Sequence, residues 1–132
     1  MRYAFQLSKK YTQEVPVYSL ILNREGKIIA ESANLVNKID VTAHAEKNVM
    51  LQVAQYEGYR NLSKYILLST LEPCDMCQEI CRLHCLNQVY FSAYNRLKQC
   101  MSPKSWIGGI LLDEGSQIIK KCFLNCRKGK IK

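Results

Sequence analysis

The sequence predicts an α/β fold, a three-layer α-β-α sandwich with a mixed five-stranded sheet. Short β-prone segments alternate with helix-like segments along the 132 residues, which is the order expected of a sheet that helices cover on both faces. An early pair of apolar runs predicts a hairpin, the antiparallel part of that sheet. The length suits one domain, so we expect residues 1–132 to form a single unit.

The amino-terminal elements follow from apolar spacing and one glycine. Apolar side chains recur at helical spacing within residues 1–12 and predict a first helix. Apolar runs over Val15 to Leu22 and Lys27 to Glu31 predict two strands. Between them, Gly26 supplies the positive φ that a tight reversal requires. These two strands form the predicted hairpin.

Beyond the hairpin, strand-like and helical spacing continue to alternate. The last expected strand is the weakest of the five because it contains two adjacent glycines. The remaining elements are, in order, a helix that starts near Thr42 to Ala45 and stops at Gly58, a strand over Tyr65 to Thr70, a helix that opens at Pro73, a strand over Val89 to Ser92, a strand over Ile107 to Leu112, and a basic amphipathic helix over Glu114 to Cys126.

The composition is that of an ordinary globular protein, with 48% hydrophobic and 23% charged residues. Apolar runs such as residues 65–68 are far shorter than the ~20 residues needed to cross a bilayer. Gln6 and Lys9 interrupt the amino terminus before the apolar core of a signal peptide forms. We therefore expect a cytoplasmic protein with no membrane segment.

Basic residues exceed acidic ones, and the net charge is +8. Such an excess attracts polyanions before any specific contact forms, so nucleic acid is the first partner considered. Arg96, Lys98 and Lys104 follow Tyr94 closely and suit an RNA-binding surface. The alternative is that these charges serve only solubility. Further basic residues near the carboxyl terminus are Lys120, Lys121, Arg127, Lys128, Lys130 and Lys132.

Two short motifs, each at the expected start of a helix, predict a metal centre. One is His44-Ala45-Glu46, and the other runs from Pro73 through Cys74 to Cys77. Zinc takes imidazole nitrogen and thiolate sulfur in tetrahedral geometry, and a catalytic site keeps its fourth position for water. His44, Cys74 and Cys77 supply three ligands, so we expect one Zn²⁺ per chain.

Glu46 is the expected acid-base group beside this metal. A carboxylate that does not bind the metal can take a proton from activated water and return it to the substrate. In a regular helix an offset of two residues points side chains apart, so the helix start must bend Glu46 and His44 together. With that bend, the pattern indicates a hydrolytic site.

The cysteines also permit other interpretations. Cys74 and Cys77 alone suit a redox Cys-x-x-Cys motif, and together with Cys81 and Cys85 they suit a structural site made of four cysteines. Cys81 and Cys85 are more simply core residues that continue the inward stripe of their helix. His84 is expected to be a hydrogen-bonded polar group. No role beyond packing is assigned to the remaining cysteines, Cys100, Cys122 and Cys126.

The paired motifs resemble those of the zinc-dependent cytidine deaminase superfamily. His44 to Glu46 and Thr70 to Cys77 carry this resemblance. Within the superfamily, the sequence is most similar to the tRNA-specific adenosine deaminases of bacteria. The flanking matches are Glu14 to Val17, Gly26 to Ile29, Asn34, Asp40 to Ala43 and, later, Gly109 to Leu111.

The resemblance implies a cytidine deaminase-like fold, zinc on His44, Cys74 and Cys77, and Glu46 as the proton shuttle. It implies that Asn34 hydrogen-bonds the substrate base or ribose. The implied reaction is hydrolysis of adenosine to inosine at the wobble position of a tRNA anticodon loop. A homodimer whose interface helps to form the RNA surface is also implied.

The sequence departs from these deaminases in two places. Val41 replaces the proline usual before the histidine motif, and Tyr94 to Ser105 replaces an Asp-x-Lys-x-Gly-Ala stretch and a longer connection. Two other functions therefore stay open. One is deamination of a free base or nucleoside such as guanine, cytosine or cytidine, and the other is a catalytically idle, zinc-stabilised RNA-binding subunit.

Overall fold

Four strands form one mixed sheet within residues 1–58 and 60–128, the part of the chain that the computed structural model describes. The sheet order is β2-β1-β3-β4. β1 runs antiparallel to both of its neighbours, and β3 and β4 run parallel. The bounds are Tyr18–Leu22 for β1, Ile28–Ala33 for β2, Ile66–Leu71 for β3 and Gln88–Ala93 for β4.

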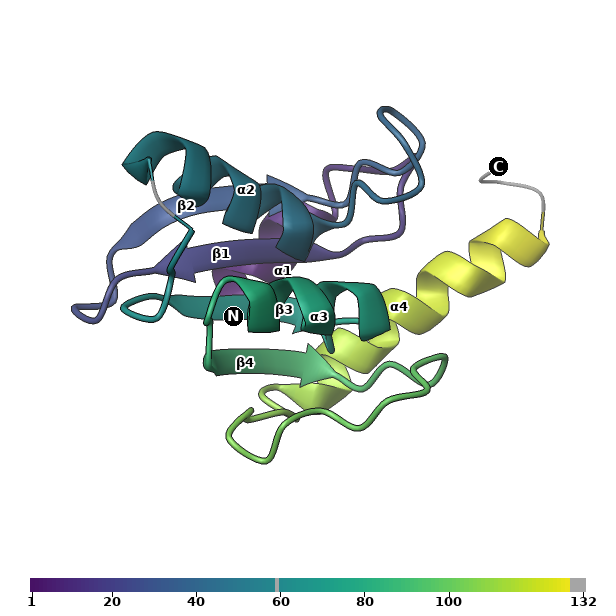
Figure 1. Cartoon of the computed structure of the whole chain (residues 1–132). Coiled ribbons are helices and arrows are strands. Elements are labelled where there is room, and N and C mark those ends of the chain that lie inside the picture. The colour runs from purple at the N-terminus through teal and green to yellow at the C-terminus, as the bar shows by residue number, and fades with distance from the viewer. Residues whose placement is uncertain (59, 129–132) are drawn as a thin grey trace.

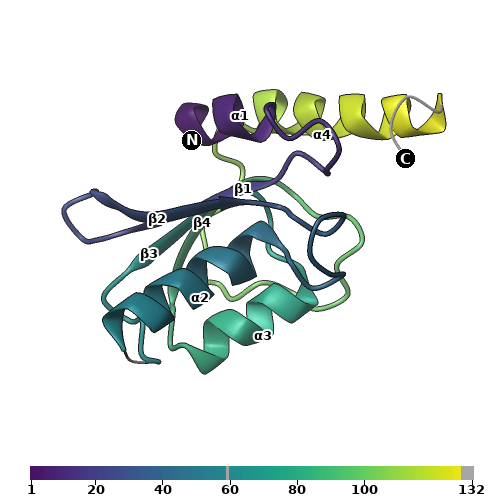
Figure 2. The ribbon, with the colours of Figure 1, turned by 90° about the horizontal axis from the view of Figure 1, so that it is seen from above.

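Helices cover both faces of this sheet. α2 (Ala45–Glu57) and α3 (Asp75–Leu83) lie on one face, while α1 (Arg2–Ser8) and α4 (Leu112–Arg127) lie on the other, as Figure 2 shows. The predicted three-layer α-β-α sandwich is therefore confirmed. α4 continues past the edge of the sheet (Figure 1). In the described part of the chain, none of the helices combines the length and the apolar character needed to span a bilayer.

The main core lies between the sheet and the layer of α2 and α3. Ile21 of β1 and Leu67 of β3 are fully buried and belong to one apolar cluster with Val49 and Met50 of α2. A smaller apolar cluster includes Ala4 of α1 and side chains of β1 and β2 on the other face. Burial on both faces holds the sheet rigidly, so the segments that leave its strand ends are fixed in place.

The predicted fifth strand over Ile107 to Leu112 is wrong. Within this segment Ile107 forms a single parallel β-bridge with Tyr90, and the N–H groups of Gly109 and Ile110 donate to β4 carbonyls without extending that bridge into a strand. The backbone then leaves the β region, because Gly109 has a φ of +80° and Leu111 a φ of +51°. Gly108 passes so close to the Phe91 ring that a Cβ atom would lie 2.2 Å from it. The two glycines thus turn the chain over β4 into α4.

The other elements differ from expectation mainly at their ends. α1 stops at Ser8 although the apolar spacing continues to residue 12. β1 begins only at Tyr18, after the proline at position 16, and β2 continues to Ala33. The two predicted glycine positions are confirmed: Gly26 has a φ of +82° in the hairpin, and Gly58 caps α2 with a φ of +69°.

Candidate metal centre

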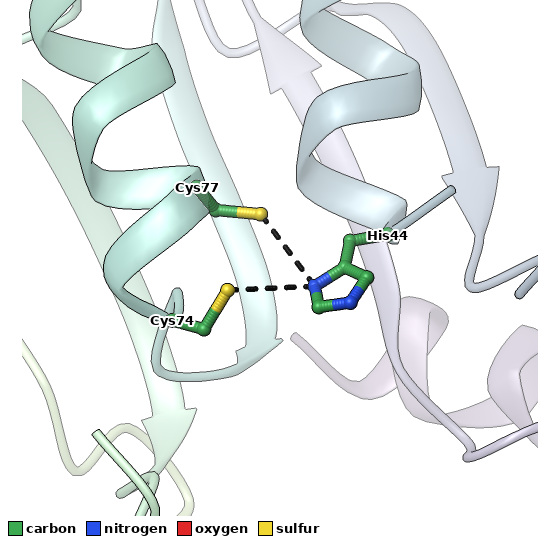
Figure 3. A group of neighbouring side chains, drawn as sticks. All are labelled: His44, Cys74 and Cys77. Atoms are coloured by element: carbon green, nitrogen blue, oxygen red, sulfur yellow. Dashed lines mark hydrogen bonds between the residues drawn. The ribbon is translucent and has the colours of Figure 1, made fainter. Parts of the chain in front are cut away.

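Two helix starts bring the predicted ligands together. His44 immediately precedes α2 and Cys74 immediately precedes α3, and each is an N-cap residue with extended backbone. Cys77 lies in the first turn of α3. Because α2 and α3 are neighbours in one layer, both sulfur atoms point toward the His44 ring, as Figure 3 shows.

The donor atoms have the spacing of a tetrahedral zinc site. Cys74 Sγ lies 3.5 Å and Cys77 Sγ 3.7 Å from His44 Nδ1, and the three ligand atoms all lie within 4.8 Å of one another. Zn–N bonds of about 2.0 Å and Zn–S bonds of about 2.3 Å, at tetrahedral angles, place nitrogen and sulfur about 3.5 Å apart. The three residues therefore fit a zinc ion and occupy three of its four positions.

The environment favours the ligand form of Cys74. Hydrogen bonds with Cys77 and His44 lower the pKa of the Cys74 thiol to about 4, so its sulfur is a thiolate at neutral pH. The hydrogen bond with Cys74 also raises the pKa of His44. The pKa of Cys77 is raised by its hydrogen bond with Cys74 and by burial. Because zinc binds thiolate, metal binding would displace the Cys77 proton.

Glu46 lies beside the ligand cluster without belonging to it. It is the second residue of α2 and is 3% exposed, and its Oε2 lies 3.9 Å from Cys77 Sγ. The offset of two residues does not separate Glu46 from His44, because His44 has a ψ of 147° and stands outside the helix. Burial raises the pKa of Glu46 to about 7. A carboxyl group with this pKa can accept and donate protons near neutral pH.

A cleft of about 940 Å³ opens beside the metal ligands. His44, Glu46 and Cys74 line it, and so does Asn34, the predicted substrate-binding residue. Asn34 is 7% exposed, and its Nδ2 donates a hydrogen bond to Glu14 Oε2 across 3.3 Å. The volume is in the range of pockets that bind small molecules, so the cleft has room for a nucleoside-sized group.

Glu14 is a cleft residue that no sequence motif marks as functional. It is 4% exposed and accepts hydrogen bonds from Asn34 Nδ2 and from the backbone N–H of Asn37, the latter across 2.9 Å. Its carboxylate thus fixes both the Asn34 amide and the loop that follows. A single acidic residue before a strand is too common in sequences to have indicated this role.

Several basic residues predicted to face RNA line the cleft, but they differ in exposure and in hydrogen bonding. Arg96, Lys120 and Arg127 line the cleft. Lys98 also lines it, but this side chain is half-buried and its ammonium donates a hydrogen bond to the Pro73 carbonyl. The others are exposed outside the cleft or fall outside the described residues: Lys104, Lys121 and Lys128 are exposed, and Lys130 and Lys132 are not described.

Across the described residues, the remaining cysteines and the second histidine are not among those that lie close enough to share a metal with His44, Cys74 and Cys77. Cys81 is buried, as predicted, with its sulfur 3.8 Å from Met50 Sδ. Cys85 is exposed with a φ of +57°, so its predicted place in the core is wrong. α3 ends at Leu83, so Cys85 lies outside the helix and does not continue its inward-facing row of side chains. His84 Nδ1 lies 2.7 Å from the Arg60 carbonyl oxygen, the expected polar contact. Cys122 is buried, and Cys100 and Cys126 are exposed.

The chain matches a sequence family and several curated proteins. Residues 1–93 match the family described as the cytidine and deoxycytidylate deaminase zinc-binding region. A tRNA-specific adenosine deaminase of Rickettsia bellii is 29% identical over 129 residues, which cover 86% of this chain and 89% of that protein. One from Agrobacterium fabrum is 36% identical over 81 residues, or 61% of this chain and 53% of that protein.

Longer proteins contain a related segment. A tRNA(Ile)-lysidine synthase of Deinococcus radiodurans is 27% identical over 129 residues, which cover 88% of this chain and 22% of the synthase. The chain thus spans about a fifth of that relative, and about half of the Agrobacterium fabrum deaminase.

Solved structures share the fold. One comes from work on A-to-I editing by tRNA:A34 deaminases at the wobble position of transfer RNA. It is 25% identical, with a TM-score of 0.79 over 89% of this chain and 96% of its own. A guanine deaminase from Nitrosomonas europaea is 17% identical, with a TM-score of 0.81 over 92% of this chain and 81% of its own. At that identity the second likeness concerns the fold alone.

Proposed function

The chain belongs to the cytidine and deoxycytidylate deaminase zinc-binding family, and from this premise we propose that it is a zinc-dependent hydrolase that converts adenosine to inosine at the wobble position of a tRNA anticodon. One observation carries the proposal. A ligand set of His44, Cys74 and Cys77 and a buried carboxylate, Glu46, lie at one cleft that is large enough for a nucleoside.

Each residue has a defined task in the proposed reaction. When bound, zinc supplies a Lewis acid that lowers the pKa of water to near neutrality. Glu46 takes one proton from the attacking water and delivers it to the purine ring nitrogen, and then takes the second proton from the hydroxyl on C6 and delivers it to the leaving amine. A C–O bond forms at C6, the C6–N bond breaks, and the products are inosine and ammonia. The pKa of Glu46, raised to about 7 by burial, suits both proton transfers.

Asn34 is the proposed contact to the substrate base or ribose. Its amide lies at the cleft wall and is held by Glu14, so its orientation is set before a ligand arrives. A fixed polar group of this kind orients a substrate at little entropic cost.

Side chains of two kinds at the cleft support an RNA substrate. Arg96, Lys120 and Arg127 supply positive charge, and Tyr94 and Phe123 are exposed aromatic rings that line the same cleft. Basic groups beside exposed rings are typical of surfaces that bind unpaired nucleotides. A loop nucleotide turned out of its stack can reach a cleft of this kind, whereas a paired one cannot.

Product analysis tests the substrate. The zinc-loaded protein is incubated with an anticodon stem-loop and, in parallel, with free guanine, cytosine, cytidine and adenosine. We expect inosine in the digested RNA by mass spectrometry and no ammonia from the free compounds. Ammonia from a free compound but no inosine in RNA would assign the chain to a free-base or nucleoside deaminase instead.

A matched pair of variants separates an enzyme from an idle RNA-binding subunit. Glu46→Gln removes the proton shuttle and is expected to lower inosine formation at least about 100-fold while zinc content stays unchanged. Glu25→Gln alters an exposed carboxylate of the hairpin and should keep full activity. Equal product from Glu46→Gln and the unaltered protein would rule out the catalytic role.

The same proposal includes a homodimer in the cytoplasm, the compartment of the proposed tRNA substrate. Leu51 and Tyr56 of α2 and Leu83 of α3 are exposed apolar side chains on the helix layer that carries the metal ligands, and a second copy would cover them. Sedimentation equilibrium should give twice the chain mass of 15.2 kDa. A monomer at micromolar concentration would contradict this part of the proposal.

A further inference from the structure

The segment from Asn95 to Ser102 lies directly against the segment that carries the cysteine ligands. Four of its hydrogen bonds go to the carboxylates on either side of Cys74, three from backbone N–H groups and one from a side chain. Glu72 accepts from Asn95 N across 3.0 Å and from Ser102 Oγ across 2.6 Å, and Asp75 accepts from Gln99 N across 3.0 Å and Cys100 N across 2.9 Å.

Lys98 lies at the centre of these contacts. Its ammonium donates to the Pro73 carbonyl oxygen across 2.8 Å and to Ser102 Oγ across 3.0 Å. It also lies 5.2 Å from the centre of the Trp106 ring, which is a cation–π contact. Ser102 in turn donates to Glu72, so one chain of hydrogen bonds runs from the Pro73 carbonyl through Lys98 and Ser102 to Glu72.

The Pro73 carbonyl oxygen links these hydrogen bonds to the metal centre. It belongs to the peptide plane between Pro73 and Cys74, and a planar peptide fixes the Cys74 nitrogen when the carbonyl oxygen is held. Cys74 precedes α3 as its N-cap. The helix holds only its carbonyl end, where the oxygen accepts from Gln78 N across 2.8 Å, and leaves the Pro73–Cys74 peptide on the other side to contacts outside the helix. The direction of its sulfur therefore depends on contacts of this kind.

We propose that Lys98 is a positioning residue for the metal centre, which holds the Pro73–Cys74 peptide so that the Cys74 sulfur faces His44. This inference deepens the proposed function but rests only on the zinc site, whichever substrate is used. It also gives the segment that departs from the related deaminases a task of its own. The ammonium is engaged within the chain, so Lys98 serves the metal and not an RNA phosphate.

Zinc release tests this role. Lys98→Met removes the ammonium and keeps the length of the side chain, and Lys104→Met removes an exposed ammonium just beyond the segment as a control. Each zinc-loaded protein is mixed with excess metallochromic chelator, and the rate of release is followed. Changes to groups that orient metal ligands cost about 10- to 100-fold in affinity, so we expect Lys98→Met to release zinc at least about 10-fold faster. Lys104→Met should match the unaltered protein.

Further measurements separate positioning from a general loss of stability. Lys98→Arg restores a cationic donor and should restore slow release. If Lys98→Met fails to fold, Ser102→Ala breaks the same chain of hydrogen bonds, with Ser105→Ala as its matched control. The zinc-free forms of the unaltered protein and of Lys98→Met should unfold at similar urea concentrations. Equal release rates for Lys98→Met and Lys104→Met would overturn the proposal, whether or not the protein deaminates tRNA.

Discussion

Asn34 and Glu14, twenty positions apart, meet at the wall of the cleft, where Asn34 Nδ2 donates to Glu14 Oε2 across 3.3 Å. The other Glu14 oxygen accepts from the backbone N–H of Asn37 across 2.9 Å. The segment before β1 thus fixes the loop after β2. The Glu14 carboxylate therefore both stabilises the cleft wall and orients Asn34, the proposed substrate contact.

Glu14→Ala should destabilise the fold. It leaves the buried Asn34 amide and the Asn37 N–H without their acceptor, and an unsatisfied buried polar group costs about 1–3 kcal/mol. We expect a loss of this size in the free energy of unfolding, measured by urea denaturation. Glu25→Ala, at an exposed hairpin position, is the control and should leave the midpoint unchanged. Equal stability of the two variants would show that the Glu14 contacts are energetically neutral.

Asn34→Ala tests the proposed substrate contact. It removes the amide from the cleft but no metal ligand, so the protein should retain zinc. We expect kcat/KM on an anticodon stem-loop to fall about 10- to 100-fold, which corresponds to the loss of one or two hydrogen bonds to the substrate. Asn61→Ala changes an exposed asparagine remote from the cleft and should leave kcat/KM as it is. Full activity of Asn34→Ala would remove this residue from the site.

Removal of zinc should lower the thermal midpoint. Zinc binds only the folded ligand set, and a free concentration of about 1,000 times Kd stabilises the folded state by about 4 kcal/mol. We expect the midpoint to fall on chelation and to return when zinc is added back. Cys77→Ala should contain less than a tenth of the zinc and show no response, whereas Cys100→Ala, which alters an exposed cysteine, should respond fully. A chelator-insensitive midpoint in the unaltered protein would contradict the metal site.

Glu46→Gln should lower the activity of the protein without lowering its stability. Burial raises the pKa of Glu46 to about 7, which means that the folded state disfavours its charge. The neutral amide has nearly the same shape, so the free energy of unfolding at pH 8 should stay equal or increase. Activity should fall at least about 100-fold, because general acid-base groups contribute 10²- to 10⁴-fold. A strong loss of stability at pH 8 would indicate that the ionised carboxylate has a structural role.

Gly115→Ala tests how closely α4 approaches the sheet. A Cβ atom at position 115 would lie 2.2 Å from Ser92 Oγ and 3.0 Å from Ser92 Cβ. Overpacking of this kind costs about 1–3 kcal/mol in the free energy of unfolding. Adding Ser92→Gly should recover part of that loss, since it removes both clashing atoms. Additive effects of the two changes would show that they do not meet.

The sequence by itself determined the ligand types and the order of the elements. His44, Cys74 and Cys77 were identified because zinc takes nitrogen and sulfur donors and these residues stand in two short motifs, and periodicity predicted the hairpin and the helices around it. The failures were local. The strand expected at Ile107 to Leu112 is interrupted by positive φ angles at Gly109 and Leu111. Cys85 lies beyond the end of its helix, which periodicity alone did not locate.

Only the tertiary structure decided which polar groups form hydrogen bonds with distant parts of the chain. Lys98 was expected on the surface as one of several basic residues, yet its ammonium donates a hydrogen bond to the Pro73 carbonyl oxygen. Glu14 had no recognisable motif, yet it holds Asn34. The physical reason is that each of the two metal motifs, His44 to Glu46 and Cys74 to Cys77, consists of characteristic residue types at a short spacing, which a sequence displays. A hydrogen bond between distant segments depends on where packing places two atoms, and local sequence does not encode that distance.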